Sequence, residues 1–285
     1  MPACVAPAGS VLRHTPQGAT LQLPKEQGPI DFVSDLHLHP GDPVTLGCAL
    51  DYLEHTPAQA VFILGDLFEA WVGDDALIDP EDFEIRCQSA LRDLAQRADV
   101  FFMHGNRDFL LGPAFAQSCG LQLLPDPCIL SWNGLRMLLS HGDAWCSTDA
   151  SYLAFRQQVR TPAWQINFLA KPLSQRRQLA QAMRAQSRQH QAQRDGGAVC
   201  DIDLDIAAQA MHHAQTQTLI HGHTHQPQDH TVQRAGQAEW SRSVLSDWDA
   251  QAQPVRAQVL RYGADGTAER INVMANAPSR APINV

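Results

Sequence analysis

The stretch Val61-Phe62-Ile63-Leu64-Gly65-Asp66 sets the pattern on which the fold of this chain depends. Four consecutive apolar residues that run into a glycine and an acid are typical of a buried strand with a polar group where the strand ends. The arrangement recurs four times, and each apolar segment stops at residues that can carry chemistry. These are Ile30–Ser34 with Asp35-x-His37, Val100–Met103 with Gly105-Asn106-Arg107-Asp108, Leu135–Leu139 with His141, and Leu219-Ile220 with Gly222-His223-x-His225.

Segments with helical periodicity lie between these strands. An apolar-periodic stretch covers about residues 45–54, and Pro80 begins a second one that continues to about Arg97. Strands that alternate with helices predict an α/β layered fold with much parallel pairing. Sheets of this kind place their ligands beyond the carboxyl ends of the strands, where every polar cluster named above lies. Three short segments after residue 240 (243–245, 255–260 and 270–273) predict further strands, which could form a second sheet packed on the first.

The length of 285 residues and an apolar fraction of 44% allow one large domain, which we assign to residues 29–273. Residues 1–28 show no hydrophobic period, so we expect a flexible N-terminal extension there and a flexible C-terminal tail over 274–285. We expect no signal peptide, because residues 1–28 lack a compact apolar stretch. No apolar run approaches the length of a membrane span.

Charge and cysteine usage exclude further classes. The formal net charge of −9 argues against a general nucleic-acid binder, which normally carries a basic surplus. The seven cysteines are scattered, odd in number and without a C-x-x-C pair. They predict reduced thiols in the cytosol that mostly serve as small apolar fillers.

Residues 151–194 differ from the rest of the chain, because they contain eight basic residues and no acidic one. The segment is rich in Ala, Gln, Leu and Arg, and Pro162 and Pro172 divide it, so we expect short helices in an insertion of about residues 148–198. A basic helical segment of this kind is often only a solvated face. Its segregated charge also suits an anionic amphiphile or an anionic lipid surface.

The polar strand ends supply carboxylates, imidazoles and a carboxamide, without a thiolate. Taken singly, each has an ordinary structural reading: Asp35 or Asp66 as a helix cap, Asn106 as a turn residue and His141 as a core histidine. Taken together, five such clusters at strand ends predict a site for divalent ions that prefer oxygen and nitrogen, such as Mn²⁺, Mg²⁺, Fe²⁺ or Zn²⁺.

The series D-x-H, G-D, G-N-x-D, H-G-D and G-H-T-H resembles the calcineurin-like metallophosphoesterases. Within that superfamily the sequence is most similar to the family of UDP-2,3-diacylglucosamine diphosphatases of lipid A biosynthesis. The similarity covers about residues 30–248 and rests on Leu64–Asp75, His104–Gly112, Met183–Ser187, Ile220–His225 and Val244–Trp248. It implies a four-layer α/β/β/α sandwich with a helical insertion that acts as a lid, and two divalent metal ions, for which Mn²⁺ is expected.

The resemblance also implies the ligands. One ion would be bound by Asp35, His37, Asp66 and His225, and the other by Asp66, Asn106, His141 and His223, so that Asp66 bridges the pair. The implied catalytic residues are Asp66, Asn106, Arg107 and His141. The implied reaction is attack of a metal-activated water on the α phosphorus of UDP-2,3-diacylglucosamine, which gives UMP and 2,3-diacylglucosamine 1-phosphate.

The implied substrate contacts are Asn106, Arg107, Asp149, Tyr152, Arg184, Ser187 and His223. Gln191 and Arg194 lie near positions where the family has Asn and Lys, and both are included as contacts. Many relatives have a histidine where this chain has Arg107. An arginine cannot act as a general acid, but its fork matches phosphate oxygens, which suits a leaving group that needs little protonation. A structural ion pair between Arg107 and Asp108 is the other reading.

Two further functions remain open at this stage: a generic two-metal phosphoesterase for nucleotides or phosphoproteins, and a non-catalytic scaffold of the same fold. The expected partners are the UDP-linked diacylated glucosamine and the anionic surface of the inner leaflet, without nucleic acid and without an obligate protein partner. We accordingly expect a cytoplasmic protein that is peripheral on the inner membrane.

Overall fold

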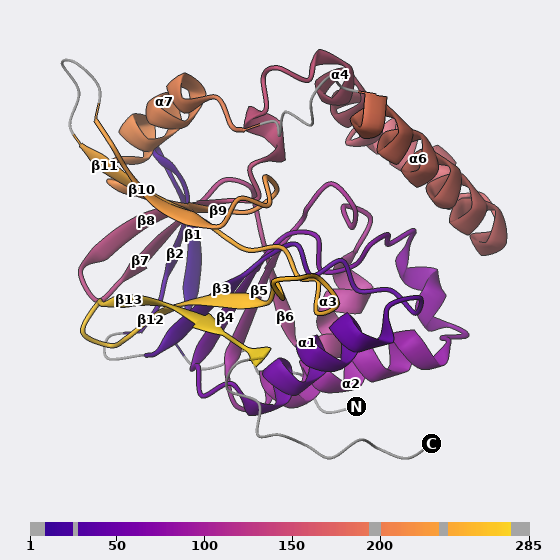
Figure 1. The fold of residues 1–285 in the computed structure, drawn as a ribbon, viewed down its shortest axis with the longest axis horizontal. Coiled ribbons are helices and arrows are strands. Elements are labelled where there is room, and N and C mark those ends of the chain that lie inside the picture. The colour runs from indigo at the N-terminus through magenta and orange to yellow at the C-terminus, as the bar shows by residue number, and fades with distance from the viewer. Residues whose placement is uncertain (1–8, 25–27, 194–200, 234–238, 275–285) are drawn as a thin grey trace.

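The computed structural model describes residues 9–24, 28–193, 201–233 and 239–274. Two β-sheets stacked face to face form its centre (Figure 1). The six-stranded sheet has the order β13 (Ala268–Asn272), β12 (Gln258–Tyr262), β3 (Ile30–Val33), β4 (Ala60–Leu64), β5 (Asp99–Met103), β6 (Leu121–Leu124). The seven-stranded sheet has the order β1 (Val11–Thr15), β2 (Gly18–Gln22), β7 (Cys128–Trp132), β8 (Leu135–Ser140), β9 (Thr218–His221), β11 (Trp240–Val244), β10 (Gln228–Val232).

Parallel pairing is concentrated in the strands that carry the polar ends. Strands β3, β4, β5 and β6 are mutually parallel, and so are β8, β9 and β11. The carboxyl ends of β3, β4 and β5 therefore lie together in one sheet, and those of β8 and β9 lie together in the other. The parallel pairing that the alternation of strands and helices predicted is confirmed.

Helices cover both outer faces, which makes the molecule a four-layer α/β/β/α sandwich, as predicted. Helices α1 (Pro43–His55), α2 (Asp82–Ala95) and α3 (Pro113–Cys119) pack on the six-stranded sheet. Helix α7 (Leu204–Ala214) packs on the seven-stranded sheet through Ala207, Met211 and Ala214. Between the sheets, Phe32 stacks on Phe62 and Phe62 on Phe101, with ring centroids 4.9 and 4.7 Å apart. These rings line the inner face of the six-stranded sheet and pack with Leu130, Trp132 and Leu139 of the other sheet in one buried core.

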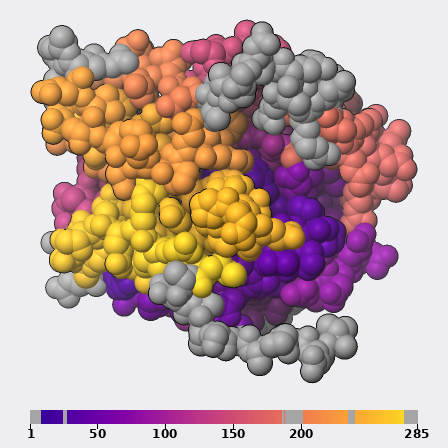
Figure 2. All heavy atoms as spheres, in the orientation of Figure 1, coloured from indigo at the N-terminus to yellow at the C-terminus, as the bar shows by residue number. Residues whose placement is uncertain are grey.

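The basic segment forms three helices that extend beyond the sandwich (Figure 1). They are α4 (Ala150–Val159), α5 (Pro162–Leu169) and α6 (Leu173–Gln193), which we call the lid helices. Pro162 is the first residue of α5 and Pro172 directly precedes α6, so both prolines divide the segment as expected. Helix α6 spans 21 residues, however, and is not short. In the space-filling view, it borders the molecule on the right (Figure 2).

The expected flexible extension over residues 1–28 is wrong for its central part. Residues 11–22 form a hairpin whose second strand, β2, pairs in parallel with β7. Leu21 is fully buried and Leu23 is 2% exposed, because both side chains pack into the layer between the sheets. The hairpin has few apolar residues, so its hydrophobic pattern is weak, and it becomes a strand pair only by completing the edge of a sheet. Residues 1–8 and 275–285 lie outside the described part of the chain.

Candidate metal centre

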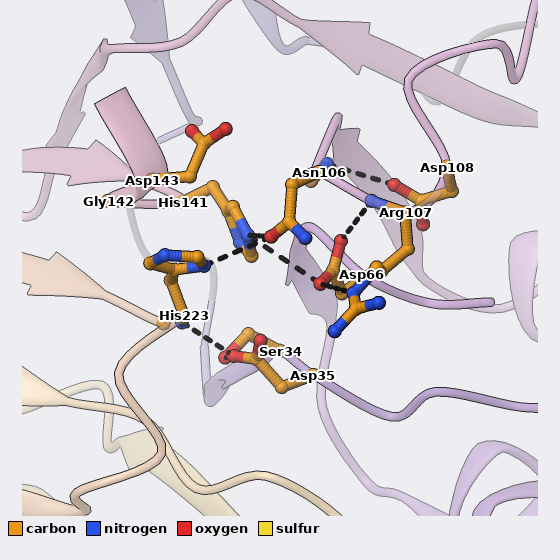
Figure 3. Close-up of polar contacts among 12 residues, drawn as sticks. Ser34, Asp35, Asp66, Asn106, Arg107, Asp108, His141, Gly142, Asp143 and His223 are labelled. Atoms are coloured by element: carbon orange, nitrogen blue, oxygen red, sulfur yellow. Dashed lines mark hydrogen bonds and ion pairs between the residues drawn. The ribbon is translucent and has the colours of Figure 1, made fainter. Parts of the chain in front are cut away.

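All seven predicted ligands lie at the ends of strands β3, β4, β5, β8 and β9, and they converge where the two sheets meet. Figure 3 shows five of them: Asp35, Asp66, Asn106, His141 and His223. Five of them have left-handed backbones, with φ between 48° and 69°: Asp35, His37, Asp66, His223 and His225. For residues other than glycine this conformation is uncommon and strained, and such strain gathers at functional sites. Backbone turns of this kind direct each side chain toward the junction of the sheets.

The glycines that precede the ligands allow the loops to approach each other closely. A Cβ atom at Gly105 would lie 2.0 Å from Asp66 Oδ1, and one at Gly222 would lie 2.4 Å from Asp35 Oδ2. Neither position can hold a larger residue without moving a candidate ligand. The motifs G-D, G-N and G-H are thereby explained by packing around the carboxylates.

A first group of donors consists of Asp35, His37 and His225. Asp35 Oδ1 lies 3.3 Å from His225 Nε2 and 3.8 Å from His37 Nε2, and the two imidazole nitrogens are 3.3 Å apart. Asp35 is fully buried, and its Oδ1 has no hydrogen-bond partner among the described residues. The other oxygen, Oδ2, accepts from Ser34 Oγ and from the backbone N–H of His223. A buried carboxylate oxygen left unpaired beside two imidazoles fits a cation, because a bound ion would satisfy it.

A second group consists of Asn106, His141 and His223, with Asp66 at its edge. The side-chain amide of Asn106 lies 3.0 Å from both His141 Nε2 and His223 Nδ1, and its nitrogen donates to these two imidazoles. His141 Nδ1 lies 2.9 Å from the carbonyl oxygen of Leu64, which can only accept, so this nitrogen carries the proton. When His141 is neutral, its Nε2 therefore presents a lone pair toward Asn106 and Asp66. That tautomer is the one a metal ligand needs.

Asp66 lies between the two groups. Its Oδ1 accepts from the backbone N–H of Arg107, while Oδ2 lies 3.8 Å from His141 Nε2 and 4.0 Å from His37 Nδ1. Asp35 reaches both groups as well, because one oxygen each of Asp35 and Asp66 and one nitrogen of His141 lie within 4.8 Å of one another. The described residues thus offer two adjacent donor groups, and the bridging role of Asp66 stays a prediction.

The electrostatics of the site follow from burial of several carboxylates and imidazoles together. Burial alone raises the pKa of Asp35, but His225, His141 and His37 lower it well below its usual range. Burial lowers the pKa of His141, yet the carboxylates of Asp66, Asp35 and Asp143 raise it to about 9. Burial and the neighbouring His141 lower the pKa of His223 to about 4. Such opposed shifts are typical of a site built for charge.

Arg107 and Asp108 turn in different directions. Arg107 Nε lies 3.7 Å from Asp66 Oδ2, on the side of the donor groups. Asp108 is fully buried and accepts from the backbone N–H groups of Leu67 and Gly105, at 2.7 and 2.9 Å. It holds the loops after β4 and β5 together, and no ion pair between Arg107 and Asp108 occurs among the described residues. The structural reading of Arg107 is therefore not supported.

Helix α4 is attached beside the second group by Asp143, at the end of β8. The buried Asp143 Oδ2 accepts from Tyr152 Oη at 2.5 Å and from Arg156 Nε at 2.8 Å. Arg160, 3.8 Å from the same oxygen, also donates to the carbonyl of Gly105. The Tyr152 ring stacks on His223 with centroids 6.1 Å apart. Tyr152 thus adjoins a candidate ligand, but its hydroxyl hydrogen is committed to Asp143.

Helix α6 brings Arg184 to the first group. One Arg184 nitrogen, Nη2, pairs with Glu69, while Nε and Nη1 are buried without a hydrogen-bond partner among the described residues. These two buried N–H donors belong to a charged guanidinium and lack acceptors in the described part of the chain, so they are suited to bind an anionic ligand. Among the other predicted contacts, Asp149 caps α4 by accepting from the N–H of Tyr152, and Ser187 is exposed on α6. The Gln191 side chain and Arg194 lie outside the described residues.

The lid arginines are largely paired with acids of the sandwich. Among the basic residues whose side chains the structure describes, five have such partners: Arg156 and Arg160 on Asp143, Arg176 on Asp75, Arg177 on Glu81 and Glu84, and Arg184 on Glu69. The absence of acids in the segment is thus explained mainly by attachment to an acidic body. Glu69, Asp75 and Asp143 lie within the sequence motifs named above, but no role was predicted for them. The complementary charge of the segment was the signal that could have identified them.

Comparisons with known proteins found close relatives over most of the chain. A UDP-2,3-diacylglucosamine hydrolase of Chromohalobacter salexigens is 43% identical over 220 residues, which are 76% of this chain and 87% of the relative. Proteins of the same name from Xanthomonas campestris pv. campestris and Stenotrophomonas maltophilia are 42% and 41% identical, over 83% of this chain and 96% and 98% of theirs. No protein-family model matches. Among the helices of the described residues, none is both long and apolar enough to cross a membrane.

Proposed function

The chain belongs to the UDP-2,3-diacylglucosamine hydrolase family, and from this premise we propose that it hydrolyses the pyrophosphate bond of UDP-2,3-diacylglucosamine in lipid A biosynthesis. The products are UMP and 2,3-diacylglucosamine 1-phosphate. The observation that carries the proposal is the convergence of seven oxygen and nitrogen donors at the strand ends where the two sheets meet, among them the buried Oδ1 of Asp35, which makes no hydrogen bond with any described residue.

Imidazoles, carboxylates and a carboxamide without a thiolate fit two divalent ions, and among these we propose Mn²⁺ because the resemblance to the family implies it. Asp35, His37, Asp66 and His225 would hold one ion, and Asp66, Asn106, His141 and His223 the other. When bound, such a pair lowers the pKa of a water molecule and offsets the charge that develops on phosphoryl oxygens.

The protein's own residues position the substrate for attack on the phosphorus nearest uridine. Arg107, whose side chain is 16% exposed, offers its guanidinium on the side where Asp66 faces the donor groups. Arg184 offers two buried N–H donors from the lid. Both can bind phosphate oxygens, and neither can release a proton at neutral pH. The departing group is itself a phosphate monoester, so it leaves without needing a general acid.

The lid also supports a peripheral position on the anionic inner leaflet. Ile166 is 69% exposed and Leu169 is 41% exposed on α5, and the exposed Lys171 follows them. Apolar side chains next to a cation are the composition that inserts at a charged lipid interface. Flotation with vesicles of anionic lipid tests this, and we expect binding that falls when Ile166 and Leu169 are replaced by Ser. Equal binding of both proteins would contradict it.

The test of the reaction is mass spectrometry of the products formed from UDP-2,3-diacylglucosamine with Mn²⁺ in ¹⁸O-labelled water. We expect UMP that carries the label and unlabelled 2,3-diacylglucosamine 1-phosphate. A label in the sugar phosphate would contradict attack at the phosphorus nearest uridine. Equal rates on acylated and deacylated substrates would favour a generic phosphoesterase instead.

A further inference from the structure

Glu69 lies between a lid helix and a candidate metal ligand, and none of the roles discussed above uses it. It belongs to the loop after β4, three residues beyond Asp66. The backbone of this loop is paired with the loop that carries His37. The N–H of Leu38 donates to Leu67 O at 2.9 Å, and the N–H of Glu69 donates to Leu38 O at 3.1 Å. These bonds fix the position of Glu69 relative to His37 independently of any side chain.

The two carboxylate oxygens of Glu69 face different partners. Oε2 lies 3.3 Å from His37 Nδ1, and Oε1 pairs with Arg184 Nη2 of helix α6. Apart from Glu69, the nearest acid to His37 Nδ1 is Asp66, whose Oδ2 is 4.0 Å away. The Glu69 side chain is 24% exposed, so the contact is largely shielded from water.

The geometry assigns the two nitrogens of His37 to different tasks. Nε2 faces Asp35 Oδ1 and His225 Nε2, which places it among the donors of the first group. Nδ1 lies 3.3 Å from Glu69 Oε2 and makes no hydrogen bond with any described residue, so this nitrogen is open to donate to that carboxylate. Histidines that bind metals typically donate their second nitrogen to a carboxylate or carbonyl, and this contact fixes the ring and raises its basicity. Glu69 stands in that position toward His37.

The same carboxylate holds the guanidinium that offers two unpaired donors. With Nη2 bound to Glu69, Arg184 is fixed with Nε and Nη1 buried and available. A single side chain therefore connects the lid to the first donor group.

We propose that Glu69 is a positioning residue that serves both the metal centre and the lid, by orienting His37 through one oxygen and Arg184 through the other. The proposal rests on the proposed function for the identity of the substrate. Beyond that function, Glu69 would serve both metal binding by His37 and substrate binding by the lid.

A second glutamate that contacts α6 allows the double role of Glu69 to be distinguished from simple attachment of the lid. Glu84 pairs with Arg177, two turns earlier on α6, with Oε1 and Nη2 at 3.1 Å. It also joins α6 to the sandwich, but among the described residues its ion pair is with Arg177 and not with a candidate ligand. Glu84→Gln therefore removes one attachment of α6 without touching the metal centre, and it is the matched control.

The experiment is calorimetric titration of the substrate-free protein with Mn²⁺, together with steady-state kinetics. We expect Glu69→Gln to weaken Mn²⁺ binding by about tenfold or more, which is the effect of losing such an outer contact, and to raise KM for the acylated substrate. Glu84→Gln should leave the Mn²⁺ affinity within twofold. Arg184→Gln should raise KM and also leave the affinity within twofold. Glu69→Asp, which keeps the charge, should recover part of the affinity.

Wild-type Mn²⁺ affinity in Glu69→Gln would overturn the proposal, and so would equal weakening in Glu84→Gln. Circular dichroism of each variant establishes that it is folded before titration, and Glu69→Asp carries the test if Glu69→Gln is not. The titration uses no substrate. A protein that binds Mn²⁺ but does not cleave the UDP-lipid would therefore contradict the proposed function and leave the role of Glu69 toward His37 intact.

Discussion

The metal centre and the lid helices are built by different means. In the metal centre, strand ends, left-handed backbones and glycines set each donor in place. In the lid, long arginine side chains reach acids of the sandwich, and the helices are held at their surfaces. Donors around an ion must keep their spacing closely, and backbone placement provides this. A helix held by ion pairs can shift when an amphiphilic substrate enters. Under the proposed function, chemistry would belong to the rigid part and substrate recognition to the attached part.

The largest effect on turnover is expected from a substitution in the metal centre. Asp66→Ala removes the carboxylate that lies between the two donor groups. It should lower kcat by about a thousandfold or more, because a bound cation contributes several kcal/mol to transition-state stabilisation. UMP release with saturating Mn²⁺ measures this, with Asp82→Ala, at the exposed start of α2, as control. Near-normal turnover would show that Asp66 is not a ligand.

A smaller effect on catalysis is expected from a substitution in the lid helices. Arg184→Ala removes two buried donors, and hydrogen bonds to a charged group contribute about 1.5–3 kcal/mol, so kcat/KM for the acylated substrate should fall roughly ten- to a hundredfold. The number of Mn²⁺ ions bound per chain should not change. If both quantities fall together, the separation between the two regions is wrong.

Attachment of the lid can be tested without substrate. Arg176 is 1% exposed and donates to the carbonyls of Val72 and Lys171, whereas its neighbour Arg177 is 35% exposed and pairs with Glu81 and Glu84. Loss of partners for buried carbonyls costs about 1–3 kcal/mol each, whereas an exposed pair contributes at most about 1 kcal/mol.

Arg176→Met should therefore raise the rate of tryptic cleavage in α6 by roughly thirtyfold, for a cost near 2 kcal/mol. Arg177→Met removes one tryptic site as well and should change the rate by less than fivefold. The melting temperature of the sandwich should stay close to that of the wild type in both. Equal rates for the two variants would show that the buried arginine is not the anchor.

The smallest effect is expected on the reactivity of the cysteine thiols. The five described cysteines are buried in the sandwich, with none in the lid helices. Burial raises the pKa of Cys48 and Cys119 to about 11 and that of Cys87 and Cys128 to about 12. At pH 8 less than about one in a thousand of these four is a thiolate, which is the reactive form. Labelling of these four cysteines with a thiol reagent, located by peptide mass spectrometry, should thus follow global unfolding, and Arg176→Met should not accelerate it.

The sequence predicted those parts of the molecule that depend on local pattern. Buried parallel strands such as 61–64 are nearly all apolar, so their ends were clear, and the donors directly follow them. Helix α3 and strands β6, β7 and β10 were not identified, because each is short, and β10 is polar as well. Pairing of the hairpin 11–22 with β7 depends on a sheet edge formed by residues more than a hundred positions away.

Contacts between side chains that are distant in the sequence could not be predicted either. Arg184 and Glu69 are 115 residues apart, and neither position alone shows which acid an arginine will meet. Asp149 illustrates the opposite case, because a local rule suffices: it precedes a helix and caps it. The predicted contact of Asp149 with substrate remains a prediction, as do those of Ser187, Gln191 and Arg194.

The left-handed backbones have a consequence for engineering this protein. Each of the five costs of the order of 1 kcal/mol, somewhat less for Asp and His than for bulkier side chains. Glycine at any of them would relax the chain and remove a donor at the same time. Selection for heat resistance alone would therefore favour inactive variants first, and a screen for robust forms of this enzyme must score turnover and melting together.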